Sequence, residues 1–316
     1  MASKANFFRQ SGGGGSEAFI ATFRTTTDNE SITLPYLSNG TYSGNIDWGD
    51  GTIVENTYEN RTHTYLVSGD YDITVLGSIN GFNFNTQSVS KDKIINIKNW
   101  GVSFLLGSSG KNFNNCTNLD ISANDSLDLT GLLDWLNLFA NCSNLEYLNG
   151  FNFTNPNSIV NFRVAFEGCT LMNARFDDLQ NVPFTSLTGS FQYCENFNND
   201  SLTNWDTSNV TEYRVTFRDC FAFNQDISSW DFSGITSYRA LQLFMNGKSS
   251  ANYNAEYYDN LLIKWASSPS VGGLPVGVLT EAIDMGTIKY TANGAAARAS
   301  ILANNKAVTI TDGGQI

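Results

Sequence analysis

The chain has 316 residues, a formal net charge of −12 and only 15% charged residues. The acidic balance argues against a nucleic-acid partner and against docking on anionic lipid, because both contacts need clustered Lys and Arg. No apolar run approaches the ~20 residues of a membrane span, so we expect no membrane insertion, and the length gives room for two or three modules with their own cores.

Residues 1–17 are typical of a flexible N-terminal arm, since Ser11 to Ser16 is a Gly-rich linker by composition. The arm is either an attachment peptide that orders on a partner, such as another virion protein, or a frayed end or expression scar. We expect attachment. The N-terminus also lacks an apolar core of signal-peptide length, which favours a protein that does not use that export route.

Residues 18–92 predict a small β-sandwich. The segments Phe19–Thr25 and Tyr71–Leu76 alternate apolar and polar residues, as a half-buried strand does. Short strands at this spacing, separated by turn signals, are typical of an immunoglobulin-like fold.

Three motifs lie in this segment: Ile46-Asp-Trp-Gly-Asp-Gly-Thr52, Thr62-His-Thr-Tyr65 and Gly69-Asp-Tyr71. Together they resemble the PKD-type domain, in which such motifs precede a Gly-x-Tyr strand. The resemblance implies a structural role in the sandwich for a set of five residues: Trp48, Asp50, His63, Tyr65 and Tyr71.

Asp47 and Asp50 leave a second interpretation open, a calcium site, because carboxylates near loop carbonyls suit a hard cation. We expect them to bond backbone amides of a tight turn instead, since Gly49 and Gly51 permit positive φ. His63 is the only histidine and no nucleophile motif accompanies it. We therefore expect no catalytic residue, no metal and no cofactor.

Residues 93–250 predict a repeat array, with 93–100 as the transition and Trp100-Gly101 as its start. Five copies of a Phe-x-x-Cys-x-x-apolar frame occur, with cysteines 26, 27, 25 and 26 residues apart. A sixth, degenerate copy begins at Phe244, with Gly247 in place of Cys. The expected core residues of the repeats are Phe113, Cys116, Phe139, Cys142, Phe166, Cys169, Phe191, Cys194, Phe217 and Cys220.

A second half travels with each copy, because Asn224 to Tyr238 echoes Asn199 to Tyr213 with an offset of 25 residues. A fixed period in this range predicts a solenoid of leucine-rich-repeat type, in which stacked units share one core. The sandwich packed on the first unit would cover its open edge, so we expect a stiff junction and no linker.

The repeat Phe-x-x-Cys-x-x-Phe-Asn-x-x-Ile-Ser-x-Trp-Asp-x-Ser-x-Val-Thr resembles the BspA-type leucine-rich-repeat surface proteins, best over residues 191–238. Members of that family are mostly cell-surface or adhesive proteins of bacteria, with relatives encoded by phages. The resemblance therefore implies adhesion or recognition at a cell surface.

Five cysteines cannot all pair internally, and their equivalent positions predict reduced thiols stacked in the core. Trp205 and Trp230, like Tyr213 and Tyr238, are expected to be neighbours along the stack. These aromatic residues form either core ladders or an exposed stripe that grips sugar rings. A compromise buries the Phe and Trp rows and leaves a recognition face: Glu212, Tyr213, Arg214, Tyr238 and Arg239.

Residues 251–316 predict a C-terminal capping region. Tyr257 to Ala266 has apolar residues at helical intervals, and Thr291 is a candidate N-cap for a helix over 292–304. A strand over 308–311 precedes a Gly-Gly turn. The full fold prediction is mainly β with short helices: a PKD-like sandwich, a leucine-rich-repeat-type solenoid and a cap.

The sequence shows no constellation of paired carboxylates, nucleophile or phosphate-binding loop, so we expect a non-enzymatic protein. We expect a bacteriophage virion component, such as a tail-fibre, receptor-binding or capsid-decoration subunit, that presents the solenoid to a cell-surface glycan or protein. The alternatives are a bacterial cell-surface or secreted adhesin and an architectural spacer without a ligand. Symmetric virion parts suggest a homotrimer or homodimer.

Overall fold

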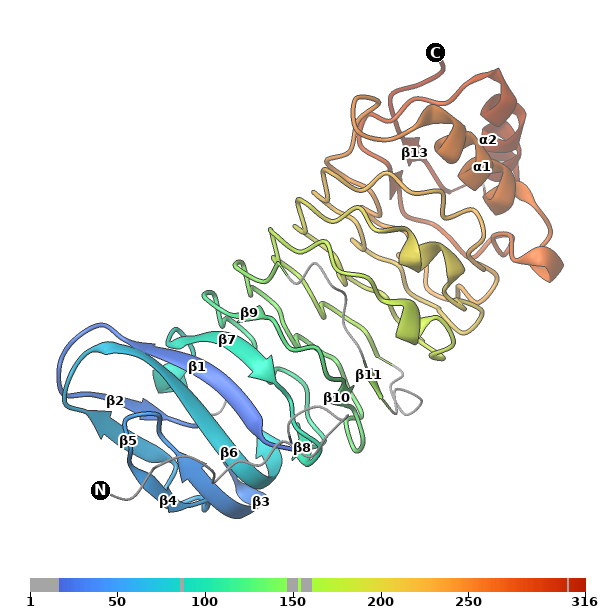
Figure 1. The fold of residues 1–316 in the computed structure, drawn as a ribbon. Coiled ribbons are helices and arrows are strands. Elements are labelled where there is room, and N and C mark those ends of the chain that lie inside the picture. The colour runs from blue at the N-terminus through green and yellow to red at the C-terminus, as the bar shows by residue number, and fades with distance from the viewer. Residues whose placement is uncertain (1–16, 86–87, 147–152, 155–160, 306) are drawn as a thin grey trace.

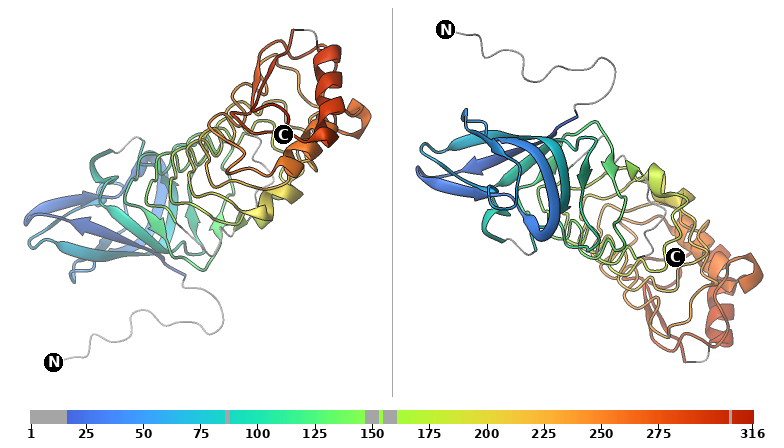
Figure 2. Two further views of the ribbon diagram at one scale, coloured as in Figure 1. Left: turned by 90° about the horizontal axis from the view of Figure 1, so that it is seen from above. Right: turned by 90° about the horizontal axis from the view of Figure 1, so that it is seen from below.

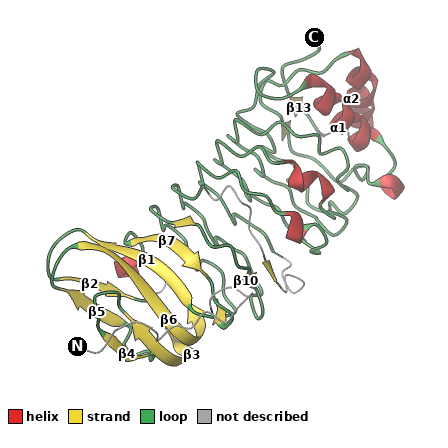
Figure 3. Ribbon diagram, in the orientation of Figure 1, coloured by secondary structure: helices red, strands yellow, loops and turns green. Residues whose placement is uncertain are grey.

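The computed structural model describes residues 17–85, 88–146, 153–154, 161–305 and 307–316. The protein is mainly β, with two α-helices and several sheets. It is elongated, with long strands at one end, the helices at the other, and successive turns of the chain lying side by side between them (Figures 1 and 2). Most of this middle region is loop in its backbone (Figure 3). No helix among the described residues is long and apolar enough to cross a membrane.

The N-terminal strands are long and the later ones short. The strands are β1 (Phe19–Thr25), β2 (Glu30–Thr33), β3 (Tyr36–Asp47), β4 (Ile53–Glu55), β5 (Thr62–Tyr65), β6 (Gly69–Phe82), β7 (Ile94–Asn99), β8 (Phe104–Leu105), β9 (Asp120–Ile121), β10 (Leu127–Asp128), β11 (Phe153–Thr154), β12 (Ile283–Asp284) and β13 (Ile310–Thr311). The helices are α1 (Ala255–Ala266) and α2 (Ala292–Asn304).

One sheet joins the N-terminal strands to the turns that follow. Its order is β4-β3-β6-β1-β7-β9, with β8 added on β6, while β2 and β5 form a separate pair. Strand β7 pairs antiparallel with β1 and parallel with β9. The boundary predicted at residue 93 therefore runs within a hydrogen-bonded sheet, and the two regions meet without a linker.

We call residues 101–250 the repeat region. Its described residues, 101–146, 153–154 and 161–250, form stacked turns of the chain that we call coils. The Phe rings of consecutive coils lie nearly parallel, with centroids 5.1 Å apart for Phe113 and Phe139 and 5.9 Å for Phe191 and Phe217. Beside them the thiols of Cys142, Cys169, Cys194 and Cys220 each donate to a carbonyl of the preceding coil, as Cys142 Sγ does to Phe113 O at 3.1 Å. These contacts make one continuous apolar core with the N-terminal strands.

The backbone of each coil alternates its hydrogen bonds. In the coil of Phe217, the N–H groups of Val215 and Phe217 donate to carbonyls of the next coil, while that of Arg218 donates within its own coil. This alternation requires two left-handed residues per coil. One lies two residues before the Phe position in the sequence, and the other lies two residues after it. In the six coils the twelve residues at these positions, all with positive φ, are Lys111, Asn115, Asn137, Asn141, Val164, Gly168, Gly189, Tyr193, Val215, Asp219, Leu243 and Gly247.

A second ladder of side-chain amides runs along another edge of the stack. The side-chain Oδ1 of Asn173 accepts the backbone N–H of Asn198 at 2.9 Å. In the same way, Oδ1 of Asn198 accepts the backbone N–H of Asn224 at 2.8 Å. Asn224 in turn accepts the N–H of Asn254 at 2.8 Å. Each coil thus satisfies a backbone donor of the next coil, which would otherwise lose a hydrogen bond.

The sixth coil departs from the predicted period. Phe191 N–H donates to Thr216 O, the residue directly before Phe217, whereas Phe217 N–H donates to Phe244 O. By this register Met245 holds the Phe position. The expectation that Phe244 begins the copy and that Gly247 replaces Cys is therefore wrong by one residue.

The shift arises from an insertion. Trp205 and Trp230 are 25 residues apart, whereas Phe217 and Met245 are 28 apart, so the last coil holds three additional residues. The sequence period hides this insertion because Tyr238 lies 25 residues after Tyr213, as an uninterrupted repeat would require.

Lys248 consequently holds the cysteine position of the sixth coil. Its side chain is buried, and Nζ donates to the carbonyls of Cys220, Phe221, Phe223 and Asn252. The row of buried thiols thus ends in the ammonium group of Lys248, which donates to the carbonyls at the end of the stack. Burial lowers the pKa of Lys248 to about 8.

The C-terminal region covers the sixth coil. Met245 N–H donates to Asp284 O on β12, and β12 pairs in parallel with β13. Helix α1 buries Tyr258, Leu261, Leu262 and Trp265, which lie at helical intervals within the predicted segment Tyr257 to Ala266.

Helix α2 spans Ala292–Asn304 and has Thr291 as its N-cap, as the sequence predicted. The carboxylate of Asp259 on α1 accepts the N–H of Thr291 at 2.9 Å and also its hydroxyl. A carboxylate at the start of a helix complements the helix dipole, so this contact fixes α2 against α1.

All five cysteines are buried and free. Thiol reagents attack the thiolate, and burial raises the pKa of each of these thiols. We predict that Ellman's reagent labels no thiol of the native protein at pH 8 and labels five after denaturation. Rapid labelling of native protein would contradict the stacked core.

Candidate functional site

The Asp-Trp-Gly-Asp-Gly-Thr motif forms a tight turn between β3 and β4. Asp47 Oδ1 accepts the N–H of Gly49 at 2.9 Å, and Asp50 Oδ1 accepts the N–H of Thr52 at 2.9 Å. Gly49 and Gly51 have φ of 81° and 96°. Both carboxylates thus bond backbone amides of the turn.

The other predicted residues of this motif pack on that turn. His63 Nε2 lies 2.7 Å from Asp50 Oδ2, and the His63 ring stacks on buried Trp48. The Tyr65 hydroxyl donates to Trp48 O at 2.8 Å, and Tyr65 stacks on Tyr71. The cluster ties β5 and β6 to the turn. Within the described residues, no group of three or more His, Cys, Asp or Glu side chains lies close enough together to hold a metal ion.

The residues expected in the repeat core lie there. The Phe and Cys residues of the five copies are buried, as are Trp205 and Trp230. The indole N–H of Trp230 donates to Leu202 O at 2.8 Å, and that of Trp205 to Phe176 O at 3.3 Å. Each indole thus satisfies a carbonyl of the preceding coil.

Tyr213 does not belong to a recognition face. Its side chain is fully buried, and its hydroxyl donates to Asp231 O. Tyr238 is 48% exposed, because it lies in the three-residue insertion of the last coil and has no position equivalent to that of Tyr213. The expectation that the two rings are neighbours along the stack is therefore wrong.

The remaining three predicted residues lie apart. Arg214 is exposed and Glu212 is half-buried, both in the coil of Phe217. Arg239 lies in the insertion, 3.8 Å from Glu281. Arg214 and Glu212 share a coil, whereas Arg239 lies with Tyr238 in the insertion of the last coil. Because Tyr213 is buried as well, the predicted group of five does not form one surface.

A surface other than the predicted recognition face forms along the segments of the coils that contain the left-handed residues. We call it the ladder face and define it as the outward side chains of residues 136–141, 163–168, 188–193, 214–219 and 242–247. One of its rows changes in every coil while the buried Phe and Cys rows stay nearly constant. That row contains Leu136, Arg163, Thr188, Arg214 and Gln242.

Arg163 and Arg214 are the exposed cations of this row, two coils apart. Neither guanidinium group has a hydrogen bond or ion pair to another described residue. Nearby, Arg218 lies over the ring of Tyr193, which is 37% exposed. The ladder face thus offers free guanidinium groups beside an aromatic ring.

Two valines occupy left-handed positions on the same face, with φ of 47° at Val164 and 50° at Val215. A β-branched residue is a rare occupant of this conformation. Gly189 lies between them in the stack, since a Cβ there would meet Val164 at 2.7 Å and Val215 at 3.7 Å. The two half-buried valines therefore form an apolar strip at a cost in backbone energy.

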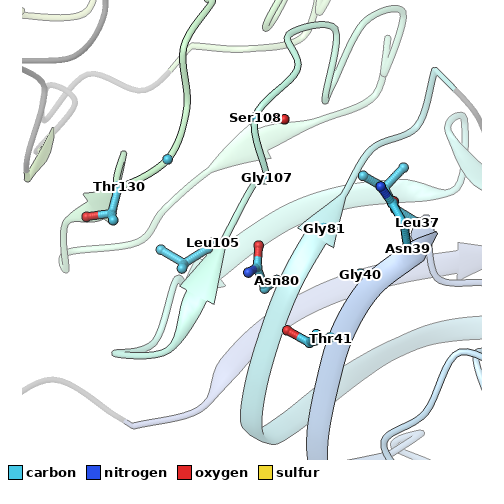
Figure 4. A pocket seen from close by; sticks show the side chains of 11 residues that line it. Leu37, Asn39, Gly40, Thr41, Asn80, Gly81, Leu105, Gly107, Ser108 and Thr130 are labelled. Atoms are coloured by element: carbon cyan, nitrogen blue, oxygen red, sulfur yellow. The ribbon is translucent and has the colours of Figure 1, made fainter.

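A hollow of about 400 Å³ lies where the N-terminal sheet meets the first coils (Figure 4). Thr41 on β3, Asn80 on β6 and Leu105 on β8 are paired in register, so their side chains share one face of the sheet. The adjacent row Tyr42, Ile79 and Phe104 packs into the core on the other face. We call this hollow the junction groove, and its lining residues are Leu37, Asn39, Gly40, Thr41, Asn80, Gly81, Leu105, Gly107, Ser108, Thr130 and Gly131.

A bulge in β3 builds one wall of the junction groove. The pairing of β3 with β6 shifts register between Tyr36 and Thr41, and the Tyr42 hydroxyl lies 2.8 Å from the carbonyl oxygens of Leu37 and Gly81. Bulges re-aim side chains and are frequent next to binding sites. The opposite wall consists of the turns at Ser108 and Thr130.

Sequence reasoning named only Arg214 of the ladder face and missed the junction groove. Val164 and Val215 gave no signal, because nothing in a sequence marks a β-branched residue as left-handed. The junction groove had one available signal, the glycines Gly40, Gly81 and Gly107 near strand ends, since glycine often marks a bulge or a close backbone approach. A strand pairing between β6 and β8 was needed to bring them together.

A family model described as "Mycoplasma protein of unknown function, DUF285" matches residues 133–258, which cover most of the repeat region and the start of α1. No curated protein and no solved structure matches the chain.

Proposed function

We propose that the protein is a non-enzymatic recognition protein that presents the ladder face to a cell-surface glycan or protein. In this proposal the repeat region is a leucine-rich-repeat-type solenoid similar to the BspA-type proteins, and the N-terminal strands form a PKD-like sandwich. The proposed setting is a bacteriophage virion component attached through residues 1–17, of which 1–16 lie outside the described residues. A bacterial surface adhesin and a spacer without a ligand are the alternatives.

The main support for this proposal is the left-handed backbone conformation of Val164 and Val215 on the ladder face. A left-handed conformation costs an L-residue other than glycine or asparagine roughly 1–2 kcal/mol. Asn137 and Gly189 hold the same repeat position at lower cost, so stacking itself does not require valine there. Strain that persists at an outward position points to a function of the side chain.

The neighbouring groups indicate the partner's chemistry. The free guanidinium groups of Arg163 and Arg214 suit carboxylate or phosphate groups, which arginine binds in bidentate fashion. The apolar strip between them suits a partner that also buries apolar surface. Cell-surface proteins and acidic glycans offer such combinations.

The test is retention of the labelled protein on a panel of bacterial cells, measured by flow cytometry. We predict that the double variant Val164→Asn/Val215→Asn loses at least tenfold in retention while its unfolding free energy rises by roughly 1 kcal/mol per site, because Asn tolerates the left-handed conformation better. The charge-reversal pair Arg163→Glu/Arg214→Glu should lose retention as well.

Val102→Asn is the matched control, since Val102 is 71% exposed and lies outside the ladder face. Its retention should equal that of the unmodified chain. Retention that survives both double variants would contradict the proposal and favour a spacer or a different binding surface.

A further inference from the structure

We propose that the junction groove binds a neutral oligosaccharide. This inference rests on the proposed function, because both assign a recognition role to the protein, but it places a defined ligand on residues separate from the ladder face. The two proposals can therefore fail independently.

The floor of the groove is polar although it belongs to a sheet. Thr41, Asn80 and Leu105 stand side by side across three strands, with Thr41 and Asn80 exposed. Hydroxyl and amide groups beside an aliphatic side chain match a sugar, which carries hydroxyls on its rim and C–H groups on its faces.

The polar groups of the groove are available to a ligand. The side chains of Asn39, Asn80 and Ser108 make no hydrogen bond to another described residue. By contrast, the side chains of Asn173 and Asn198 in the repeat region each accept a backbone N–H of the next coil. An amide presents a donor and an acceptor side by side, so it can bond two neighbouring hydroxyls of one ring.

The groove carries no charge. Its eleven lining residues include no Asp, Glu, Lys, Arg or His. An anionic ligand such as a phosphate needs cationic or multiple amide donors to offset its lost hydration, so a neutral ligand fits better. Charge appears only in the adjoining hollow, where Lys111 and Asp134 lie.

The adjoining hollow extends the site. It has a volume of about 450 Å³, shares Ser108 with the junction groove and is lined also by Asn83 and Asn85. Two hollows that meet at one residue suit a chain of several rings better than a single small molecule.

The walls are held in place before any ligand arrives. The Tyr42 hydroxyl lies 2.8 Å from the carbonyl oxygens of both Leu37 and Gly81, so it ties the β3 bulge to β6. A Cβ at Gly81 would lie 3.2 Å from Gly40 Cα, which shows how closely the backbones approach. A rigid groove loses little entropy when it binds a ligand.

The experiment uses the full chain with cellotetraose, maltotetraose and chitotetraose as probes and inorganic phosphate as the charged comparison. Binding is measured by saturation-transfer-difference NMR and then by titration. We predict that at least one tetrasaccharide binds, that Asn80→Ala weakens it fivefold or more, and that Thr41→Trp abolishes it by filling the groove.

Asn196→Ala serves as the matched control, because Asn196 is an exposed asparagine outside the groove. It should bind like the unmodified chain, and thermal unfolding midpoints show whether each variant is folded. If Thr41→Trp does not fold, Asn39→Ala replaces it, with an expected loss of threefold or more.

Three outcomes would overturn the inference: no tetrasaccharide binds, binding is unchanged in Thr41→Trp or its replacement, or phosphate binds and displaces the sugar. If Thr41→Trp is still retained on cells, the ladder-face proposal remains supported even though the groove is filled. The cell-retention test and the sugar-binding test therefore distinguish failure of one proposal from failure of the other.

Discussion

Raising the pH from 9 to 10 is expected to lower the free energy of unfolding by at least ~4 kcal/mol. The cause is the row of five buried thiols, whose pKa values burial raises above the ordinary value of 9.0, in the case of Cys220 to about 12. Below pH 9 both states keep these protons. Above it the unfolded chain releases them and the folded chain does not, so stability falls as the pH rises.

Lys248 acts in the opposite direction, because its pKa of about 8 lies below the ordinary 10.5 and the unfolded state therefore binds the extra proton. Between pH 9 and 10 the five thiols lower the free energy of unfolding by about 5 kcal/mol, and the lysine raises it by about 1 kcal/mol. The net effect is therefore a loss of stability. Urea unfolding at each pH measures the slope. Cys220→Ala should reduce it by about one quarter, and a flat profile between pH 9 and 10 would contradict the buried thiol row.

Replacing Lys248 with alanine is expected to destabilise the protein by roughly 3 kcal/mol or more. The substitution removes the donor for the carbonyls of Cys220, Phe221, Phe223 and Asn252, and leaves them buried at the end of the stack. Urea unfolding at pH 7 measures the loss.

Lys248→Cys is the informative comparison, because every other coil has a cysteine at this position. A thiol can donate to the preceding coil, as Cys220 Sγ does to Cys194 O at 3.0 Å. This variant should recover part of the stability lost in Lys248→Ala. Equal stability of the alanine variant and the unmodified chain would show that Lys248 does not close the row.

The sequence predicted the inward residues well because their identity repeats with the period. Phe and Cys recur at nearly fixed spacing, and side chains that fill one shared core must be similar in size. The same argument failed at the sixth coil, where three inserted residues left Phe244 and Tyr238 at misleading spacings. Only the backbone hydrogen bonds identify Met245 and Lys248 as the equivalent residues.

The outward surfaces were beyond prediction for a physical reason. The left-handed conformation of Val164 and Val215 is imposed by hydrogen bonds between coils, and valine has no preference for it. The junction groove depends on pairing between β6 and β8 and on a bulge in β3, and neither leaves a periodic signal. Tyr213 was misplaced because aromatic residues occur both in cores and on recognition surfaces.

Hydroxyl-radical footprinting of the protein on cells that retain it is the most direct test of recognition through the ladder face. Tyr193 is 37% exposed on that face, whereas Leu66 is 77% exposed in the loop between β5 and β6. The proposal predicts that contact with cells protects Tyr193, Val164 and Val215 from oxidation while Leu66 is labelled as in free protein. Unchanged labelling of the ladder face in protein that is bound to cells would contradict it.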